Sequence, residues 1–374
     1  MHDAASDHSS IWIQLIQHPP SSIDKLSYWR DIREQWMTSL NLPPDSALLL
    51  CSAQGIQSKH HLITMIYDEL LRAAAEYIEE ILEHMGYGKP PAAYAFVQFG
   101  SGGRKEMTPW SDQDHGLIWA SVEGTKQEEI EHYFIQWGQK YTEAVTALGF
   151  PPCTGNVLAS NPEWRGSISQ WIERTSHWMT DLGWESMRTL TMAFDMRTVY
   201  GDSRLEYEWR NALKMLQGDQ HLPISQAIIA NLLHRKRAQN SFGQLIRERY
   251  GKDAGQFDIK YRLYVPIAQM TRATAWLYGI YDQYYSTSER MDCLMEMPIP
   301  EDLKLIVSDI RNNWHIISAI RLMAAGHLAD EGWQSSGMVD LGLVSAEKKQ
   351  VLKHISQAST RWMRWLERRG GHER

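Results

Sequence analysis

The sequence is poor in cysteine and lacks long apolar runs. Its three cysteines, Cys51, Cys153 and Cys293, lie far apart and share no C-x-x-C spacing, so by themselves they form neither a disulfide framework nor a zinc site. We expect buried thiols in a reducing compartment. No stretch approaches the ~20 consecutive apolar residues of a membrane-spanning helix, and the N-terminal residues MHDAASDHSS lack the basic and apolar regions of a signal peptide. These features predict a cytoplasmic protein with no membrane partner.

The sequence also lacks an excess of positive charge. Its 38 Lys and Arg residues against 45 Asp and Glu residues give a net charge of −7. A protein whose main partner is DNA or RNA needs a basic surface that neutralises phosphates, so we expect no nucleic-acid partner. With 374 residues, of which 43% are hydrophobic, the chain is long enough for two or three domains with cores of their own.

Helical patterns dominate both ends of the chain. No regular structure is expected for residues 1 to about 20, but apolar residues recur at helical spacing in 21–36 and 58–85. This predicts an N-terminal helical region over residues 1–89. Residues 218–374 are predicted to form a helical substrate-binding or interaction domain. The helices predicted from residue 167 onward are 167–180, 184–200, 203–217, 222–250, 260–286, 300–327 and 344–369.

The middle of the chain, residues 90–217, changes its pattern. Two short apolar runs, 92–100 and 114–122, are typical of strands, and 151–160 is a candidate third strand. A helix is predicted between them at 126–150. A small mixed sheet set among many helices is an α+β architecture rather than an alternating one.

The segment FGSGGRKEMTPWSDQDHGLIW, residues 99–119, joins the two predicted strands and combines several chemically active residues. Residues i and i+2 of a strand point to one face, so we expect Asp112 and Asp114 to place two carboxylates together. Two such carboxylates repel each other, and one pKa rises unless a cation lies between them. Mg²⁺ or Mn²⁺ is the natural cation, because it binds carboxylate oxygens together with substrate phosphates.

The same segment offers donors for phosphate groups. Arg104 provides a planar guanidinium and Lys105 a point charge. The glycine-rich turn before them, which can expose backbone N–H groups without Cβ clashes, consists of Gly100, Ser101, Gly102 and Gly103. The alternative is an ordinary glycine-rich turn with a solvated acid pair. The segment lacks the G-K-[S/T] ending of a Walker A loop, and it runs from strand to strand, unlike a dinucleotide fingerprint.

This segment resembles the DNA polymerase β-like nucleotidyltransferase superfamily, in which a Gly-Ser turn joins a strand to a second strand with an acid-x-acid pair. More closely, it is similar to bacterial nucleotidyltransferases related to PII-protein uridylyltransferase, whose pattern is roughly G-S-x-G-R-x-E-x-T-x-x-S/T-D-Q-D. The matching residues are Gly100, Ser101, Gly103, Arg104, Glu106, Thr108, Ser111, Asp112, Gln113 and Asp114.

The resemblance extends over roughly residues 20 to 330. The stretch CTGNVLASNPEWRGSISQW looks like the family's segment after its helix, and AFDMRTVYGDSRL looks like its D-x-R-x-V-x-G-D segment. FDIKYRLYVPIAQMTRATAWLYGI resembles the helical C-terminal domain, with Lys260, Pro266 and Arg272 in register. Members of this group often carry CBS-type regulatory domains ahead of this region. We expect none here, so no adenylate-sensing role is carried over.

The resemblance implies a uridylyl- or adenylyltransferase that moves a nucleoside monophosphate from an NTP to an acceptor hydroxyl. The acceptor would be a protein such as PII or a small molecule, and a homo-oligomer is left open. Asp112 and Asp114 would hold Mg²⁺ or Mn²⁺. Ser101, together with Arg104 and the amides of the turn, would bind the phosphates. Further candidate nucleotide contacts are Lys105, Ser111 and Lys260.

The superfamily commonly uses a third carboxylate, and the candidate third strand at 151–160 contains no acid. Asp195 is a candidate catalytic residue and Glu163 another, although Asp195 could instead pair with Arg197 or Arg188. Without a third acid, the chain could be a catalytically weak or inactive nucleotide-binding regulatory module. A third interpretation is an antibiotic-type small-molecule nucleotidyltransferase, which shares the general motif but not the extensions.

Three further features each allow two interpretations. Glu106 either pairs with Arg104 or Lys105 and fixes the loop, or takes part in the chemistry. His115 either packs on its strand neighbours or acts as a base. The basic run 234–252 is either a solvated face or folds back over the sheet to contact the nucleotide or an acidic acceptor.

Overall fold

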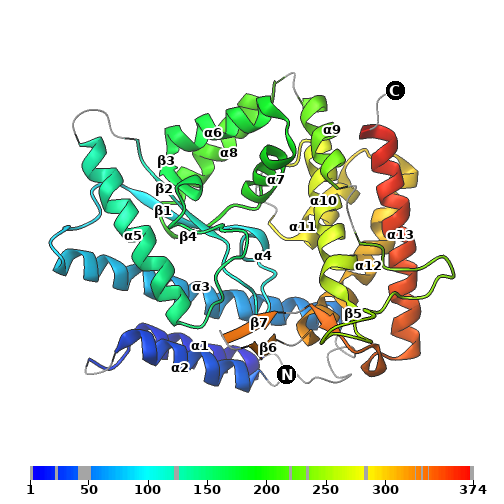
Figure 1. Cartoon of the computed structure of the whole chain (residues 1–374), viewed down its shortest axis with the longest axis horizontal. Coiled ribbons are helices and arrows are strands. Elements are labelled where there is room, and N and C mark those ends of the chain that lie inside the picture. The colour runs from blue at the N-terminus through cyan, green and yellow to red at the C-terminus, as the bar shows by residue number, and fades with distance from the viewer. Residues whose placement is uncertain are drawn as a thin grey trace.

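A four-stranded sheet lies near the middle of the molecule, with helices of the N-terminal half around it and the C-terminal helices side by side to its right (Figure 1). The structure is a computed structural model of the chain. It describes residues 3–21, 24–40, 52–121, 126–218, 221–232, 236–281, 285–324, 326–329, 332–335 and 337–370. Cys51 lies outside the described residues, whereas Cys153 and Cys293 are thiols that are not in a disulfide.

The first helices of the described chain are α1 (Asp3–Gln17), α2 (Lys25–Ser39) and α3 (Ala53–His84). The expectation that residues 1 to about 20 have no regular structure is therefore wrong. The indole N–H of Trp29 donates to the carbonyl of Ile16 at 2.9 Å, which ties α1 to α2. The long helix α3 runs beneath the sheet and packs on α1 (Figure 1).

The central sheet contains β1 (Tyr94–Gln98), β2 (His115–Trp119), β3 (Arg165–Ser167) and β4 (Arg197–Gly201) in the order β3-β2-β1-β4. β1 pairs antiparallel with β2 and β4, whereas β2 and β3 are parallel. Every residue of β1 and β2 is buried, which explains why both strands are continuous apolar runs rather than alternating ones. The small mixed sheet among helices confirms the α+β class.

One strand prediction and one helix prediction in this region are wrong. Residues 151–160 form no strand; the third strand is Arg165–Ser167. Pro151 and Pro152 cannot donate hydrogen bonds to a ladder. The predicted helix 184–200 ends early, because two of its last residues, the β-branched Thr198 and the aromatic Tyr200, pair with β1 instead, with Val199 at the irregularity between them.

Helices cover both sides of the sheet. α3 and α5 (Gln127–Ala147) pack together on one side, and α6 (Ile168–Asp181) and α8 (Arg204–Gln217) on the other (Figure 1). The short helix α7 (Trp184–Ala193) packs against α6 and leads toward the C-terminal half. Each of these helices begins within a few residues of its predicted start.

The C-terminal half is mostly helical. Its described elements are α9 (His221–Asn231), β5 (Phe257–Asp258), a π-helical turn (Lys260–Tyr264), α10 (Val265–Leu277), α11 (Thr287–Glu296), α12 (Glu301–Met323), β6 (Gly326–Ala329), β7 (Gly332–Ser335), β8 (Met338–Val339) and α13 (Ala346–Gly370). α13 lies at the edge of the molecule, against α9, α10 and α12 (Figure 1). Within the described residues, no helix combines the length and the apolar character needed to cross a bilayer.

Two predicted C-terminal helices are too long. The helix expected at 222–250 stops at Asn231, and 236–250 is irregular, with Gly243 at a positive φ of 70°. A helix cannot continue through such a residue. The helix expected at 260–286 ends at Leu277, and α11 follows as a separate helix with a capping box at Ser286.

Candidate active site

The loop between β1 and β2 returns to its starting point. The N–H of Phe99 donates to the backbone oxygen of Asp114 at 2.8 Å, which closes the base of the loop. Its first part is the single helical turn α4 (Gly100–Gly103), and the N–H of Glu106 donates back to the oxygen of Ser101 at 2.8 Å. The glycine turn at the start of the loop therefore lies beside the acid pair at its end.

The two acids lie together, but not for the predicted reason. Asp112 and Asp114 are half-buried and precede β2 in irregular backbone, so they are not strand residues. Their carboxylates and the thiol of Cys153 each offer one ligand atom, and these atoms lie within 4.8 Å of one another. The fold of the loop, rather than strand alternation, brings the pair together.

The glycines of the turn differ in which atoms they approach. Gly100 has a φ of 51°, and a Cβ there would lie 2.5 Å from Oδ2 of Asp114, so only glycine fits this close approach. Cβ atoms at Gly102 and Gly103 would instead lie 2.8 Å from Cδ of Gln98 and 1.9 Å from the backbone oxygen of Asp195. Gly100 thus contacts the acid pair, whereas the other two glycines are packing positions.

The electrostatics of the acid pair agree with expectation. Burial, together with the neighbouring Asp112 carboxylate, raises the pKa of Asp114 to about 7. The positive charge of Lys260, a half-buried residue of the C-terminal half, acts in the opposite direction. Two neighbouring half-buried carboxylates, of which Asp114 has a raised pKa, form a site that a divalent cation would stabilise.

Cys153 is the third member of the group, and the sequence-based reasoning missed it. Burial and the Asp114 carboxylate raise the pKa of the Cys153 thiol to about 12, and this thiol hydrogen-bonds to Asp114. Two backbone bonds place it there: the N–H of Gln113 donates to the oxygen of Pro151 at 2.9 Å, and the N–H of His115 to that of Val157 at 3.0 Å. The sequence contains one indication of this: Cys153 belongs to residues 151–160, the candidate third strand in which a third metal-binding residue was sought.

The donor set fits a hard divalent cation at the carboxylates. Asp112 and Asp114 offer the oxygen ligands that Mg²⁺ and Mn²⁺ take. A protonated thiol is a poor ligand for Mg²⁺, so Cys153 fits the site as a hydrogen-bond donor to Asp114. Among the described residues, neither Asp195 nor Glu163 belongs to this group.

Arg104 turns away from the expected phosphate position. Its side chain is buried, with Nε donating to Glu106 at 2.8 Å, Nη1 to Asp195 at 2.5 Å and Nη2 to the Tyr264 hydroxyl at 3.3 Å. Each nitrogen of the guanidinium therefore has a partner within the protein. This geometry favours a positioning role over direct contact with a nucleotide.

Asp195 is the centre of a buried ion cluster. It is 0% exposed, and besides Arg104 it accepts from Arg272 at 2.8 Å and from Arg290 at 2.6 Å. Burial opposes its ionisation, but Arg272, Arg104 and Arg290 outweigh that effect and lower its pKa to about 2. We refer to Asp195 and these three arginines as the arginine cluster. Its geometry gives no support to the prediction that Asp195 is a metal-binding catalytic acid.

The alternative partners considered for Asp195 are engaged elsewhere. Arg197 forms a two-pronged pair with Asp68 at 2.7 and 2.9 Å, and Arg188 pairs with Glu185 at 2.6 Å. The general expectation that Asp195 pairs with arginine holds, but its partners come from distant parts of the chain.

Glu106 fixes the loop, as one of its two interpretations had it. Its carboxylate accepts from Arg104, from the Tyr264 hydroxyl at 2.6 Å and from the N–H of Thr287 at 2.6 Å. Tyr264 and Thr287 belong to the C-terminal half, so Glu106 joins the loop to that half.

His115 is a packing residue. Nδ1 accepts from the N–H of Ala159 at 3.1 Å, Nε2 lies 2.8 Å from Oε1 of Gln113, and the ring packs between Phe96 and Tyr141. Burial lowers its pKa to about 3. Both ring nitrogens are engaged and the ring is neutral, so the interpretation as a general base is not supported.

The remaining predicted contacts divide between structural and exposed positions. Ser111 is buried, and its hydroxyl accepts from the N–H of Thr108 at 2.8 Å, so it shapes the loop. Lys105 is exposed, with its ammonium 5.1 Å from the centre of the Tyr285 ring. It lines a cavity of about 220 Å³ beside α3, α11 and α12, together with His60. Neither residue is part of the acid pair's group.

Two family models match this chain. Residues 46–183 match the family described as "Putative nucleotidyltransferase DUF294", and residues 224–369 match "Putative nucleotidyltransferase substrate binding domain". The first match contains the glycine turn and the acid pair, and the second contains Lys260. No curated protein matches the chain.

Proposed function

Because the chain belongs to the nucleotidyltransferase family that these two matches describe, we propose that it transfers a nucleoside monophosphate from an NTP to an acceptor hydroxyl. The observation that carries the proposal is the half-buried pair of Asp112 and Asp114, held against Gly100 in one loop. The raised pKa of Asp114 supports a site built for a divalent cation. We assign Mg²⁺ or Mn²⁺ to this site.

Asp112 and Asp114 would hold the metal ion. Once bound, a divalent ion supplies charge stabilisation for the reacting phosphates. Gly100 lets Asp114 approach the turn, and Ser101 follows directly with its hydroxyl. Lys260, which acts electrostatically on Asp114 from the C-terminal half, would bring positive charge to the triphosphate. The nucleotide would thus lie between the glycine turn and the π-helical turn.

The reaction would be an in-line displacement at the α-phosphorus. The acceptor oxygen forms a bond to this phosphorus, the bond from phosphorus to the bridging oxygen breaks, and pyrophosphate leaves with the electron pair. The hydroxyl proton passes to water. Catalysis of this kind consists mainly of positioning and charge stabilisation, and the chain would supply both through the acid pair and the turn.

The arginine cluster would act at a distance from the chemistry. Arg104 follows the turn directly, and its partners Arg272 and Arg290 act through Asp195 from the C-terminal half. We propose that the cluster and Glu106 hold the turn in a fixed position relative to that half. Arg104 and Asp195 are then positioning residues.

A second candidate function is a nucleotide-binding module without significant turnover. The observation that favours it is the third position of the metal-ligand group, which is the thiol of Cys153 instead of a carboxylate. If two carboxylates position the metal ions too loosely, the nucleotide is bound but not transferred.

The test is a transfer assay with NTPs labelled at the α-phosphate. The purified chain is incubated with each NTP, Mg²⁺ or Mn²⁺, and either a PII protein or a cell lysate as acceptor. We expect labelled product from the wild type and at least a ~10³-fold loss in Asp112→Asn/Asp114→Asn, as for the removal of major electrostatic groups. Glu128→Gln/Glu129→Gln, exposed on α5, is the charge-matched control and keeps the activity.

Two results would contradict the transfer activity. Labelled product that persists in the acid-pair variant would come from another site or a contaminant. Metal-dependent NTP binding without transfer to any acceptor, with either ion, would replace the enzyme by the binding module.

A further inference from the structure

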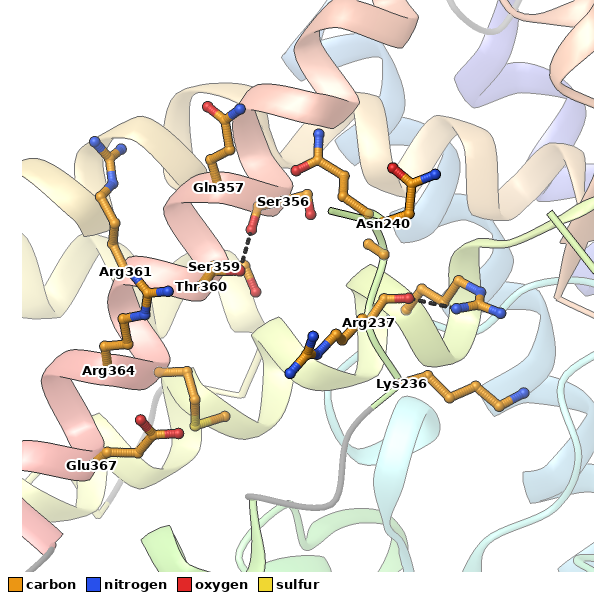
Figure 2. Close-up of a pocket in the computed structure, with 14 residues that line it drawn as sticks. Lys236, Arg237, Asn240, Ser356, Gln357, Ser359, Thr360, Arg361, Arg364 and Glu367 are labelled. Atoms are coloured by element: carbon orange, nitrogen blue, oxygen red, sulfur yellow. Dashed lines mark hydrogen bonds between the residues drawn. The ribbon is translucent and has the colours of Figure 1, made fainter. Parts of the chain in front are cut away.

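A second cavity, of about 650 Å³, lies between the irregular segment 236–240 and α13, apart from the glycine turn (Figure 2). We call it the basic groove, because its charged lining consists of Lys236, Arg237, Arg262, Arg361, Arg364 and Glu367. Five of these six side chains are cationic. The groove lies within residues 224–369, which match the substrate binding domain.

Part of this positive charge is not neutralised by the protein. Arg237 extends from its segment toward α13, and Arg364 stands on α13 (Figure 2). Neither has a side-chain hydrogen bond or ion pair to a described residue. The other three cations have acidic partners in the pairs Lys236–Asp258 (3.1 Å), Arg262–Glu248 (2.7 Å) and Arg361–Asp309 (2.8 Å).

Arg262 adds a buried donor. Its side chain is 10% exposed, and its Nε has no hydrogen-bond partner among the described residues. Buried N–H groups in folded proteins are nearly always paired. This Nε is closed off from solvent, and the other two nitrogens of the guanidinium donate to the carbonyl oxygen of Arg237 and to Glu248, so Arg262 is a fixed cation in the wall of the groove.

The lining favours phosphate oxygens. Guanidinium groups match phosphate with paired hydrogen bonds, and the hydroxyl of Thr360 and the amides of Asn240 and Gln357 add neutral polar groups around them. The described lining contains no aromatic ring on which a base could stack. The volume falls within the range of roughly 300–1,000 Å³ typical of small-molecule sites. We infer that the basic groove binds a small molecule with more than one phosphate group.

One ring links the groove to the candidate active site. The ammonium of Lys236 lies 5.7 Å from the centre of the Tyr261 ring, and that of Lys260 lies 5.3 Å from the same centre. Lys260 in turn acts on Asp114. We therefore assign the ligand of the groove as the acceptor of the transfer reaction, a step that rests on the proposed function. The binding itself does not depend on transfer activity.

The test is isothermal titration with inorganic pyrophosphate in the presence of EDTA. Without a divalent ion, Asp112 and Asp114 repel phosphate, so the titration reports the groove. We expect binding to the wild type that weakens roughly 10- to 100-fold in Arg237→Ala/Arg364→Ala, as for the loss of charge-assisted hydrogen bonds. Arg237→Lys/Arg364→Lys, which keeps the charge but loses the planar groups, should fall in between.

Two control variants separate this inference from the proposed function. Arg188→Ala/Arg204→Ala removes the same charge from a half-buried position on α7 and an exposed position on α8, both outside the groove lining, and should bind pyrophosphate as the wild type does. Asp112→Asn/Asp114→Asn should also bind it in EDTA, even though it loses transfer activity. A failed transfer assay therefore leaves the groove intact, and a failed titration leaves the transfer activity intact.

Three outcomes would overturn the inference. The first is a wild type that does not bind pyrophosphate in EDTA. The second is equal affinity of the wild type and Arg237→Ala/Arg364→Ala, with native unfolding curves for both. The third is a hexaglutamate peptide that binds the wild type more tightly than pyrophosphate and loses binding in the groove variant, which would assign the groove to an acidic peptide.

Discussion

Two acidic centres lie next to one glycine turn, the half-buried acid pair and the buried Asp195. Gly100 approaches the side chain of Asp114, and Gly103 approaches the backbone of Asp195. Asp195 accepts hydrogen bonds from three arginines, and its pKa is lowered to about 2. Asp114 faces another carboxylate, and its pKa is raised to about 7.

The difference separates a structural charge from a functional one. The negative charge of Asp195 is fully compensated by three arginines, and the arginine cluster holds parts of the chain together without a ligand. The acid pair is incomplete, because burial and mutual repulsion leave it short of positive charge. Groups perturbed in this way are candidates for ligand sites. A motif arginine, Arg104, belongs to the arginine cluster, even though its sequence position suggested a phosphate contact.

The largest expected effect is the loss of stability in Asp195→Asn. Three arginines would then face a neutral amide in a buried site, and breaking a buried ion pair costs about 3–5 kcal/mol. Asp112→Asn/Asp114→Asn should be as stable as the wild type or more so, because it relieves repulsion. Urea unfolding of the three proteins measures the difference. Equal stability of Asp195→Asn and the wild type would contradict the structural role of the Asp195 charge.

The next effect is stabilisation by a divalent ion. At a concentration 100 times its Kd, Mn²⁺ or Mg²⁺ should raise the free energy of unfolding of the wild type by about 2.7 kcal/mol. The ion would neutralise Asp112 and Asp114, so the double Asn variant should show no increase. Thermal unfolding with and without EDTA gives the measurement. An unchanged increase in the variant would place the metal elsewhere.

The third effect is a loss of stability in acid. The pKa of Asp195 is lowered from 3.8 to about 2, so its contribution is complete above about pH 4 and is lost as the pH falls toward 2. This loss is on the order of 2 kcal/mol. Subtracting the unfolding free energy of Asp195→Asn from that of the wild type, between pH 5 and 2, isolates it. A difference independent of pH would show that Asp195 is not held ionised by the cluster.

The smallest effect distinguishes backbone strain at a glycine from a steric contact with Asp114. Gly100→Ala and Gly88→Ala both place alanine at a positive φ, 51° and 76°, which costs about 1 kcal/mol each. A Cβ at Gly88 meets nothing within 4 Å, whereas one at Gly100 lies 2.5 Å from Asp114. Only Gly100→Ala should therefore weaken the stabilisation by divalent ions. Equal metal responses of the two variants would remove Gly100 from the site.

Local patterns predicted a good part of this molecule. The apolar runs of β1 and β2, the long helix α3 and the helices α6, α8, α12 and α13 are confirmed, because their periodicity follows from which face is buried. The loop with its glycine turn and acid pair was also recognisable, since all of its residues lie within one short segment. The domain limits 1–89, 90–217 and 218–374 stay predictions.

Charge partners, in contrast, depend on the tertiary structure. The partner of Arg104 in the arginine cluster lies 91 residues away, and Cys153 reaches Asp114 through hydrogen bonds between separate segments. Residues 197–201 joined the sheet against their helical pattern because β1 offered them a partner. The sequence alone therefore determined which groups are available for chemistry near the turn. Only the fold decided which charges are neutralised internally and which remain for a ligand, because that choice depends on burial and on neighbours that are distant along the chain.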